Sequence, residues 1–247
     1  MKLRGLISGV VICAVAYLWA AEEKKCKFTQ ESLNAYIRDE IVTDCHELDV
    51  EWFDAWMERE GVTHEMLANA FEKVVRDNIK VKEPAEKKTE LVCAFEYFAR
   101  YATQERMKLL LWVIDNAVDD LIATEGVRCY YHHLKDRNEF VKNMIPYLEK
   151  EDKERRSSRS VIWSYLLEEL DGPYRDVIIK LSREGIHNPH GHIYYPDRVL
   201  LKVDPNYEKS ELRKEAFRKA VENKEFAKQE PSPYAVIKSI YEKLESK

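Results

Sequence analysis

The sequence predicts an all-α protein built of stacked antiparallel helical hairpins. Glycine is rare, with seven in 247 residues, and so few glycines cannot supply the turns of a sandwich or barrel. Apolar residues recur every three to four positions through most of the chain, which is the period of an amphipathic helix. Helical segments are followed by Gly61, Gly126, Gly172 and Gly185, and glycines in this position indicate helix stops.

Four helices are expected between residues 29 and 102. The first opens near Thr29 as N-cap, the second follows Asp49, and the third opens at Thr63 and ends before Pro84, which breaks the pattern. The fourth lies in residues 89–102. Their inward residues are, in order, Leu33, Tyr36 and Ile37; Trp52, Phe53, Trp56 and Met57; Leu67, Ala70, Phe71, Val74 and Val75; and Leu91, Phe95, Phe98 and Ala102.

Four more helices are expected between residues 104 and 184. Residues 104–122 form one apolar stripe, and Asp136 with Glu139 forms a capping box for a helix that Pro146 should kink or end early. Residues 158–170 and 173–184 follow, and Pro173 suits the first turn of the last of these helices. The inward residues are, by segment, Met107, Leu110, Leu111, Ile114, Val118 and Leu121; and Val161, Ile162, Tyr165 and Leu166.

The helical period fails between residues 186 and 206. Aromatic and β-branched residues there predict a brief extended segment or hairpin around Pro196 and Asp197. A long non-helical stretch in a compact domain is typically functional or disordered, and this one is too apolar to be disordered. Helical signals resume in residues 209–226 and again after Ser232-Pro233.

Short polar links between consecutive helices favour antiparallel neighbours. The arrangement resembles, in architecture alone, helical-repeat proteins of the HEAT or armadillo kind, especially across residues 84–185. No fixed repeat period or signature residue supports a true repeat, and an irregular helical bundle is the alternative. We expect one domain over residues 21–247, with a possible sub-boundary at 186–206.

The N-terminus has the layout of a signal peptide, because Lys2 and Arg4 precede an uncharged stretch over residues 5–21. Cleavage after Ala20 would export the chain to the periplasm, the cell surface or the exterior. The apolar run is shorter than the roughly 20 residues that span a bilayer comfortably. The alternative is an uncleaved N-terminal membrane anchor.

The charge of the mature chain argues against nucleic acid as a partner. Removal of the two leading basic residues leaves 38 basic against 45 acidic residues, so the net charge falls from −5 to −7. Phosphate binding needs a clustered basic face. We therefore expect a protein or peptide partner, and a membrane contact only if the N-terminal segment stays attached.

Four cysteines remain after cleavage: Cys26, Cys45, Cys93 and Cys129. An even number in an oxidising compartment predicts disulfides. Of the three possible pairings, Cys26–Cys45 with Cys93–Cys129 would tie neighbouring helices together. The alternative is that the cysteines pack as small apolar side chains.

The segment HNPHGH carries three histidines, His187, His190 and His192. Neutral imidazoles suit zinc, copper or nickel, and Asp197 offers a carboxylate to complete the set. The spacing matches no known ligand pattern, so a solvated polar loop is the competing interpretation. Apart from this possible zinc, no cofactor is expected.

The other candidates are tyrosines and one cysteine–histidine pair. Tyr194 and Tyr195 follow the histidine loop and could form a recognition surface with its three histidines, because tyrosine is favoured at interfaces. Cys129 and His133 lie one helical turn apart and could form a nucleophilic pair, but an oxidising compartment favours a disulfide for the cysteine.

These observations favour an exported helical binding or scaffold module. No phosphate loop, nucleophile elbow or C-x-x-C pair occurs in the sequence, so no catalytic residue is assigned. The alternatives are a metal-dependent, hydrolase-like enzyme built around residues 187–192, and a membrane-anchored interaction subunit.

Overall fold

The structure, a computed structural model of the chain, describes residues 26–42, 50–80, 85–149, 156–187, 193–229 and 231–246. The predicted signal peptide over residues 1–20 lies outside these ranges, as does the predicted anchor, and both stay predictions. Within the same ranges, no helix is both long and apolar enough to cross a membrane.

The all-α prediction is confirmed for the described residues, which form thirteen α-helices, short 3₁₀ and π segments, and no strand. The α-helices are α2 (Gln30–Tyr36), α3 (Val50–Glu60), α4 (His64–Asn78), α5 (Ala85–Tyr101), α6 (Lys108–Asn116), α7 (Asp120–His133), α8 (Arg137–Glu149), α9 (Arg156–Glu168), α10 (Arg175–Gly185), α11 (Tyr194–Val203), α12 (Glu211–Glu222), α13 (Lys224–Gln229) and α14 (Pro231–Glu245).

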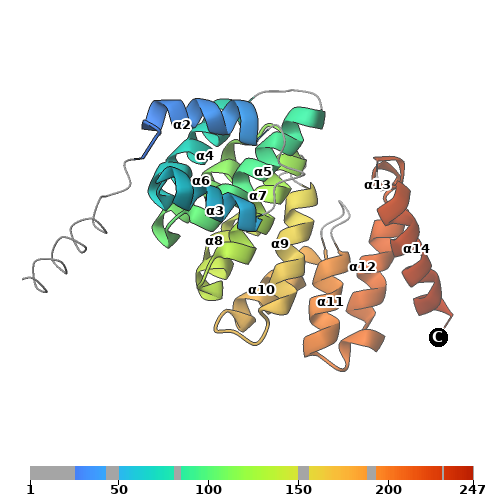
Figure 1. Cartoon of the computed structure of the whole chain (residues 1–247). Helices are drawn as coiled ribbons and strands as arrows, with labels where there is room; N and C mark the ends of the chain where they lie inside the picture. Colours follow the sequence, from blue (N-terminus) through green and yellow to red (C-terminus); the bar gives the residue numbers. More distant parts are fainter. Residues whose placement is uncertain are drawn as a thin grey trace, which may run out of the picture.

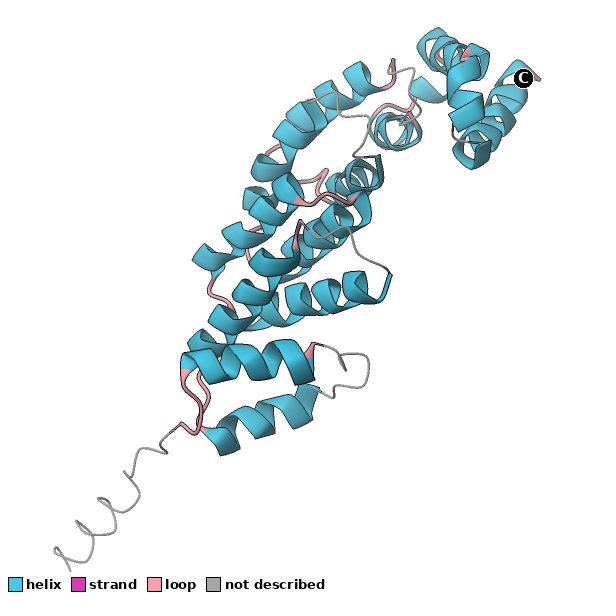
Figure 2. Ribbon diagram, turned by 90° about the horizontal axis from the view of Figure 1, so that it is seen from above, coloured by secondary structure: helices cyan, strands magenta, loops and turns pink. Residues whose placement is uncertain are grey.

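Consecutive helices pack against each other as pairs, namely α4 with α5, α6 with α7, α8 with α9 and α10 with α11. The second helices of these pairs also touch one another in sequence, so α5, α7, α9 and α11 form a continuous row. Figures 1 and 2 show the resulting elongated stack, with α2 near one end and α14 at the other. Side chains from neighbouring helices of the row can therefore form one surface.

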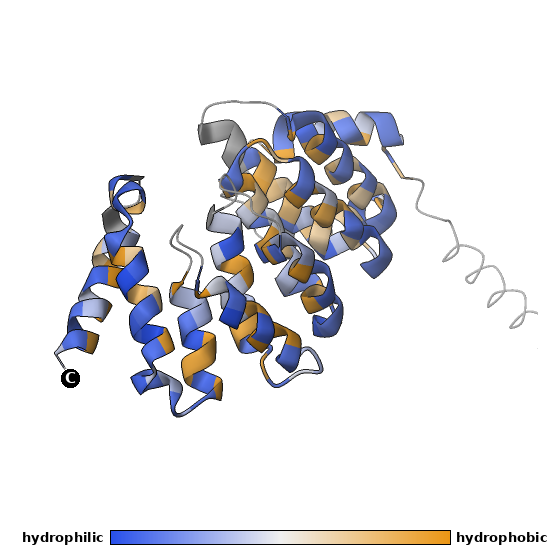
Figure 3. Cartoon of the chain, turned by 180° about the vertical axis from the view of Figure 1, so that it is seen from behind, coloured by the Kyte–Doolittle hydropathy of each residue, from blue (hydrophilic) through white to orange (hydrophobic). Residues whose placement is uncertain are grey.

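The buried apolar residues fall into two clusters. The larger one extends from α2 to α11, and the smaller one joins Ile186, Ile193 and Leu200 to α12, α13 and α14. Figure 3 shows apolar residues on the sides where helices meet and polar residues over much of the outer surface. The boundary between the clusters falls inside the predicted sub-boundary region, while the number of domains stays a prediction.

The predicted caps at Thr29 and Thr63 and the predicted apolar stripe of α4 are confirmed. Three other residues predicted to face inward are instead exposed, namely Trp52, Val118 and Leu121. Thr63 accepts a hydrogen bond from the backbone N–H of Met66 and caps α4, and Gly61 ends α3 with a φ of 69°, the left-handed conformation that favours glycine. Every predicted inward residue of α4 is buried. The sequence predicts α3 and α4 well because the cap at Thr63, the apolar stripe of α4 and the stop at Gly61 all indicate the same helix boundaries.

The prediction of an extended segment or hairpin around Pro196 and Asp197 is wrong, because these residues lie in the first turn of α11. Proline is tolerated in a first helical turn, where its missing N–H would have no intrahelical partner. An acidic residue is favoured there by the helix dipole. The segment is therefore a short helix in spite of its aromatic and β-branched residues. Its side chains Val199 and Leu200 are buried against neighbouring helices.

The predicted single helix over residues 104–122 is divided in the structure. A 3₁₀ turn, Gln104–Met107, leads into α6, and Ala117 is extended at its end. Asp119 then caps α7 by accepting a hydrogen bond from the N–H of Leu121. The predicted early end at Pro146 is also absent, since α8 continues through it to Glu149.

Gly126 is not a helix stop but lies in the middle of α7, where the chain passes close to α6. A Cβ at this position would lie 3.0 Å from a methyl carbon of Val113, closer than normal packing allows. Glycine is costly inside a helix, so its presence here reflects the close approach of two helices.

We expect Gly126→Leu to lower the free energy of unfolding by about 2 kcal/mol, because extra carbon atoms must enter a filled core. Leucine is a good helix former, so the loss would report packing alone. Gly126→Ala serves as control, since its smaller clash is offset by better helix propensity. Urea denaturation measures both variants, and equal stability of the leucine variant and the wild type would contradict close packing.

Candidate functional site

The structure describes one of the three predicted loop histidines. His187 follows α10 and is exposed, while His190 and His192 lie outside the described residues. Their convergence on a metal, and the solvated-loop alternative, therefore both stay predictions. Among the described residues, no group of three or more histidine, cysteine or carboxylate side chains is placed to hold a metal ion.

Tyr194 and Tyr195 lie in the first turn of α11 rather than in an irregular loop. Their rings meet edge to face with centroids 5.3 Å apart. Tyr194 is 37% exposed, with the Arg198 guanidinium 5.8 Å from its ring centroid. Tyr195 instead packs against the larger core. Of the two, only Tyr194 retains much accessible surface for a partner.

Asp197, the predicted carboxylate ligand, is held by a buried arginine. Its two oxygens accept hydrogen bonds of 2.7 Å and 3.0 Å from the Nε and Nη2 of Arg213 on α12. Burial raises the pKa of Asp197, and the guanidinium opposes that shift. The structure therefore shows the carboxylate as a contact between helices.

Both predicted disulfide pairs are wrong, because Cys26 and Cys129 are free thiols. The Cys26 sulfur lies 4.0 Å from the sulfur of Met66, and Cys129 is 2% exposed inside the larger core. No two of the described cysteines are joined to each other, and Cys93 is disulfide-bonded.

Cys129 and His133 do not form a nucleophilic pair. The Cys129 thiol donates to Oε1 of Glu96 on α5 at 3.3 Å, and the His133 Nε2 lies 2.9 Å from the other oxygen of Glu96. Burial and the neighbouring Glu96 carboxylate raise the pKa of the thiol far above its usual range. A thiol held protonated in this way cannot supply the thiolate that nucleophilic catalysis requires.

We expect Cys129 in the folded protein to resist alkylation by iodoacetamide at pH 8, and Cys26, which is partly exposed, to react first. Mass spectrometric mapping of the alkylated peptides after timed quenching measures both rates. In urea the two rates should converge, which serves as the control. Fast modification of Cys129 in the native state would contradict the assignment of a buried, protonated thiol.

A stacked pair of tyrosines joins α7 to α9. The rings of Tyr131 and Tyr165 are nearly parallel with centroids 3.8 Å apart, and the edge of Phe140 meets Tyr131 at 4.9 Å. The guanidinium carbon of Arg137 lies 4.0 Å from the Tyr131 ring centroid, as in a cation–π contact. Rings packed in this way have little freedom to move.

The polar atoms of this pair are held as well. The Tyr131 hydroxyl lies 2.9 Å from an oxygen of Glu168 and 2.9 Å from an oxygen of Glu169, and its one proton can satisfy one carboxylate at a time. The Tyr165 hydroxyl lies 3.1 Å from Nε2 of His132. Burial and the two carboxylates raise the pKa of Tyr131, so its hydroxyl stays a donor at neutral pH.

Charged side chains surround Tyr165 on the surface of the helix row. The Arg128 side chain is 51% exposed and lies 3.6 Å from Glu125, and both interact electrostatically with Tyr165. We define the Tyr165 patch as the polar surface residues of α5, α7 and α9 around this ring: Glu96, Glu125, Arg128, His132, His133, Tyr165 and Glu168. It combines an aromatic centre with charges of both signs.

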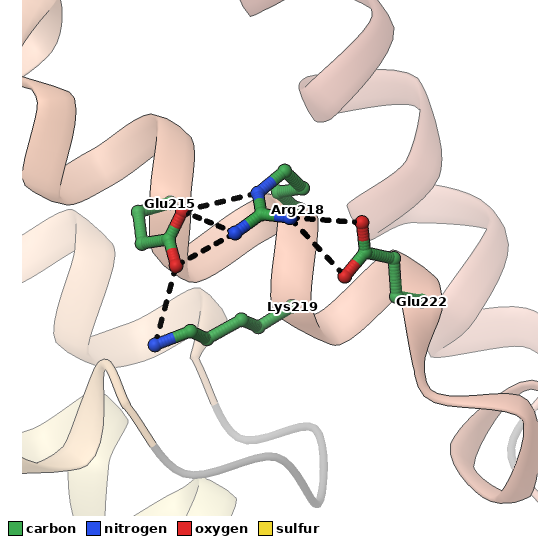
Figure 4. A network of polar contacts seen from close by, with 4 residues as sticks. All are labelled: Glu215, Arg218, Lys219 and Glu222. Atoms are coloured by element: carbon green, nitrogen blue, oxygen red, sulfur yellow. Dashed lines mark hydrogen bonds and ion pairs between the residues drawn. The ribbon is translucent and has the colours of Figure 1, made fainter.

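A shallow hollow of about 520 Å³ lies between α12 and α14 and is the other candidate. Leu212 and Tyr241 supply its apolar lining, and Glu215 and Arg218 lie beside them. Figure 4 shows Arg218 between Glu215 and Glu222, with Lys219 also on Glu215. Since Arg218 is already held by two carboxylates, it has little capacity left for an anionic ligand.

The sequence did not predict the Tyr165 patch, since it suggested only the pair of Cys129 and His133 in this region and an inward position for Tyr165. The contact between His132 and Tyr165 joins residues 33 positions apart on different helices. The run of tyrosines and histidines at residues 130–133 was the available signal. Which of those side chains face α9 depends on how the helices pack.

Comparison with known proteins provides no family assignment for the chain. No protein-family model, no curated protein and no solved structure matches it.

Proposed function

We propose that the protein is an exported helical module that binds a protein or peptide partner through the Tyr165 patch. The observation that carries the proposal is the set of contacts around Tyr165, which orders side chains from α5, α7 and α9 while leaving their outer edges accessible. Continuation of the helix pairs into a superhelix of the HEAT or armadillo type belongs to the same proposal.

The physical support comes from preorganisation. Association costs free energy when mobile side chains must be ordered at an interface. Here the Tyr165 ring is stacked on Tyr131 and its hydroxyl is held by His132. These side chains are already ordered in the folded protein, so binding a partner would cost less conformational entropy. Tyrosine and arginine are also the residues that most often dominate binding energy.

Glu96 is fixed in the same way at the edge of the patch. The hydrogen bond from His133 lowers the pKa of Glu96, with burial opposing it and the Cys129 thiol adding a second donor. Its side chain is nevertheless 54% exposed. An ionised, oriented and accessible carboxylate can accept a hydrogen bond from a partner.

Site-specific photo-crosslinking tests the proposal. A photoreactive amino acid replaces Arg128 or Glu168 in the patch, and Lys180 on α10, which is 75% exposed, is the matched control. The protein is produced in its source cells, irradiated, and the adducts are identified by mass spectrometry. We expect both patch positions to capture the same partner and position 180 to capture none. Equal capture from all three positions, or none from the patch, would contradict the proposal.

A further inference from the structure

The two apolar clusters meet at the junction between α11 and α12. Helix α11 contributes Val199 to the larger apolar cluster and Leu200 to the smaller one. It meets α12 mainly through the 3₁₀ turn Tyr207–Lys209 that lies between them. The C-terminal unit, α12 to α14, is therefore attached to the rest of the stack over a small apolar contact.

A buried ion pair crosses this junction. The side chains of Arg213 and Asp197 are 10% and 3% exposed, whereas each other ion pair recorded among the described residues has a partner at least a quarter exposed. Two parallel hydrogen bonds join the pair, the Glu208 carbonyl lies 3.5 Å from Nη1 of Arg213, and the Phe217 ring lies against the guanidinium.

The position of Arg213 does not benefit its own helix. It lies in the first turn of α12, where the helix dipole disfavours a cation. Burying two charges also costs desolvation energy, and an apolar pair in their place is often as stable or more stable. An apolar contact is non-directional, whereas the planar fork of arginine on a carboxylate fixes both distance and angle.

We propose that the Asp197–Arg213 pair is a latch that fixes the orientation of the C-terminal unit on the stack, and that residues 204–210 become a hinge when the pair is broken. This proposal does not depend on the Tyr165 patch. It assigns Asp197 and Arg213 a conformational role, with the apolar contacts of Leu200 and Tyr207 holding the unit in place without setting its angle.

Distance measurements between spin labels test the latch in the full chain. Bio-orthogonal labels at Asp176 on α10 and Lys238 on α14 report the junction, and labels at Lys73 on α4 and Lys142 on α8 report the larger cluster as control. The variant Asp197→Leu/Arg213→Met removes both charges together. We expect it to keep its helical content and to broaden the junction distance distribution about twofold, while the control distribution is unchanged.

The variant Arg213→Lys is a second, independent test of the latch, because lysine keeps the positive charge but cannot donate two parallel hydrogen bonds to Asp197. We expect it to broaden the same distribution, and it decides the test if the double variant fails to fold. An unchanged junction distribution in a folded double variant, or in Arg213→Lys when the double variant is unfolded, would overturn the latch.

Discussion

Arg213→Met is expected to lower the free energy of unfolding by about 3–5 kcal/mol at neutral pH, because it leaves the buried carboxylate of Asp197 without its counter-charge. Methionine fills a similar volume, so the loss would come from the unpaired charge rather than from a cavity. Urea denaturation followed by circular dichroism measures it.

The size of this loss should depend on pH. In the variant, burial without a cation raises the folded-state pKa of Asp197 above its unfolded value, so the folded state binds the proton more tightly. The deficit is therefore largest above the folded pKa and shrinks as the pH falls through it. Denaturation at pH 7.5 and pH 5 would show this trend.

Arg218→Met is the matched control on the same helix. Arg218 is exposed and bonded to Glu215 and Glu222 (Figure 4), and exposed ion pairs contribute little to stability. We expect its unfolding curve to stay close to that of the wild type. Similar curves for the two arginine variants would show that the burial of Arg213 has no energetic consequence.

Tyr131→Ala is expected to lower the free energy of unfolding by about 3–5 kcal/mol, the usual cost of removing a large buried aromatic ring. Tyr131 is 6% exposed, and the variant would lose the stack on Tyr165 together with the contacts to Phe140 and Arg137. Denaturant unfolding monitored by tryptophan fluorescence gives the value.

Tyr131→Phe separates the ring from its hydroxyl. The ring contacts remain, and Glu168 is exposed, so water can replace the lost donor. We expect a cost of about 1 kcal/mol, that of one net hydrogen bond. If the alanine variant were no less stable than the phenylalanine variant, Tyr131 would not be the packing centre between α7 and α9.

Local signals predicted much of the helical framework. Thr63 caps α4 and Gly61 ends α3 in the left-handed conformation, because each depends on the chemistry of a single residue and its near neighbours. The sequence-based predictions were wrong at residues whose conformation depends on packing against other helices. From the sequence alone Gly126 resembles a helix stop. In the structure it lies inside α7, where the absence of a side chain allows close packing against Val113 of α6.

The candidate site was less predictable for the same reason. Asp197 has the chemistry of a metal ligand, and only the arrangement of α11 and α12 shows that Arg213 is its partner. The Tyr165 patch depends on side chains brought together from α5, α7 and α9, and no motif in one segment encodes it. Composition predicts that such residues are available, while packing determines which of them meet.

The most direct measurement for the proposed binding role is the affinity of the crosslinked partner, once purified, for three forms of the protein. Isothermal titration calorimetry would compare the wild type with Arg128→Glu in the Tyr165 patch and with Arg183→Glu, an equal charge change at an exposed position on α10. We predict that Arg128→Glu weakens binding at least about tenfold, which is about 1.4 kcal/mol, and that Arg183→Glu binds as the wild type does. Equal affinity of all three forms would contradict a role for the patch in binding.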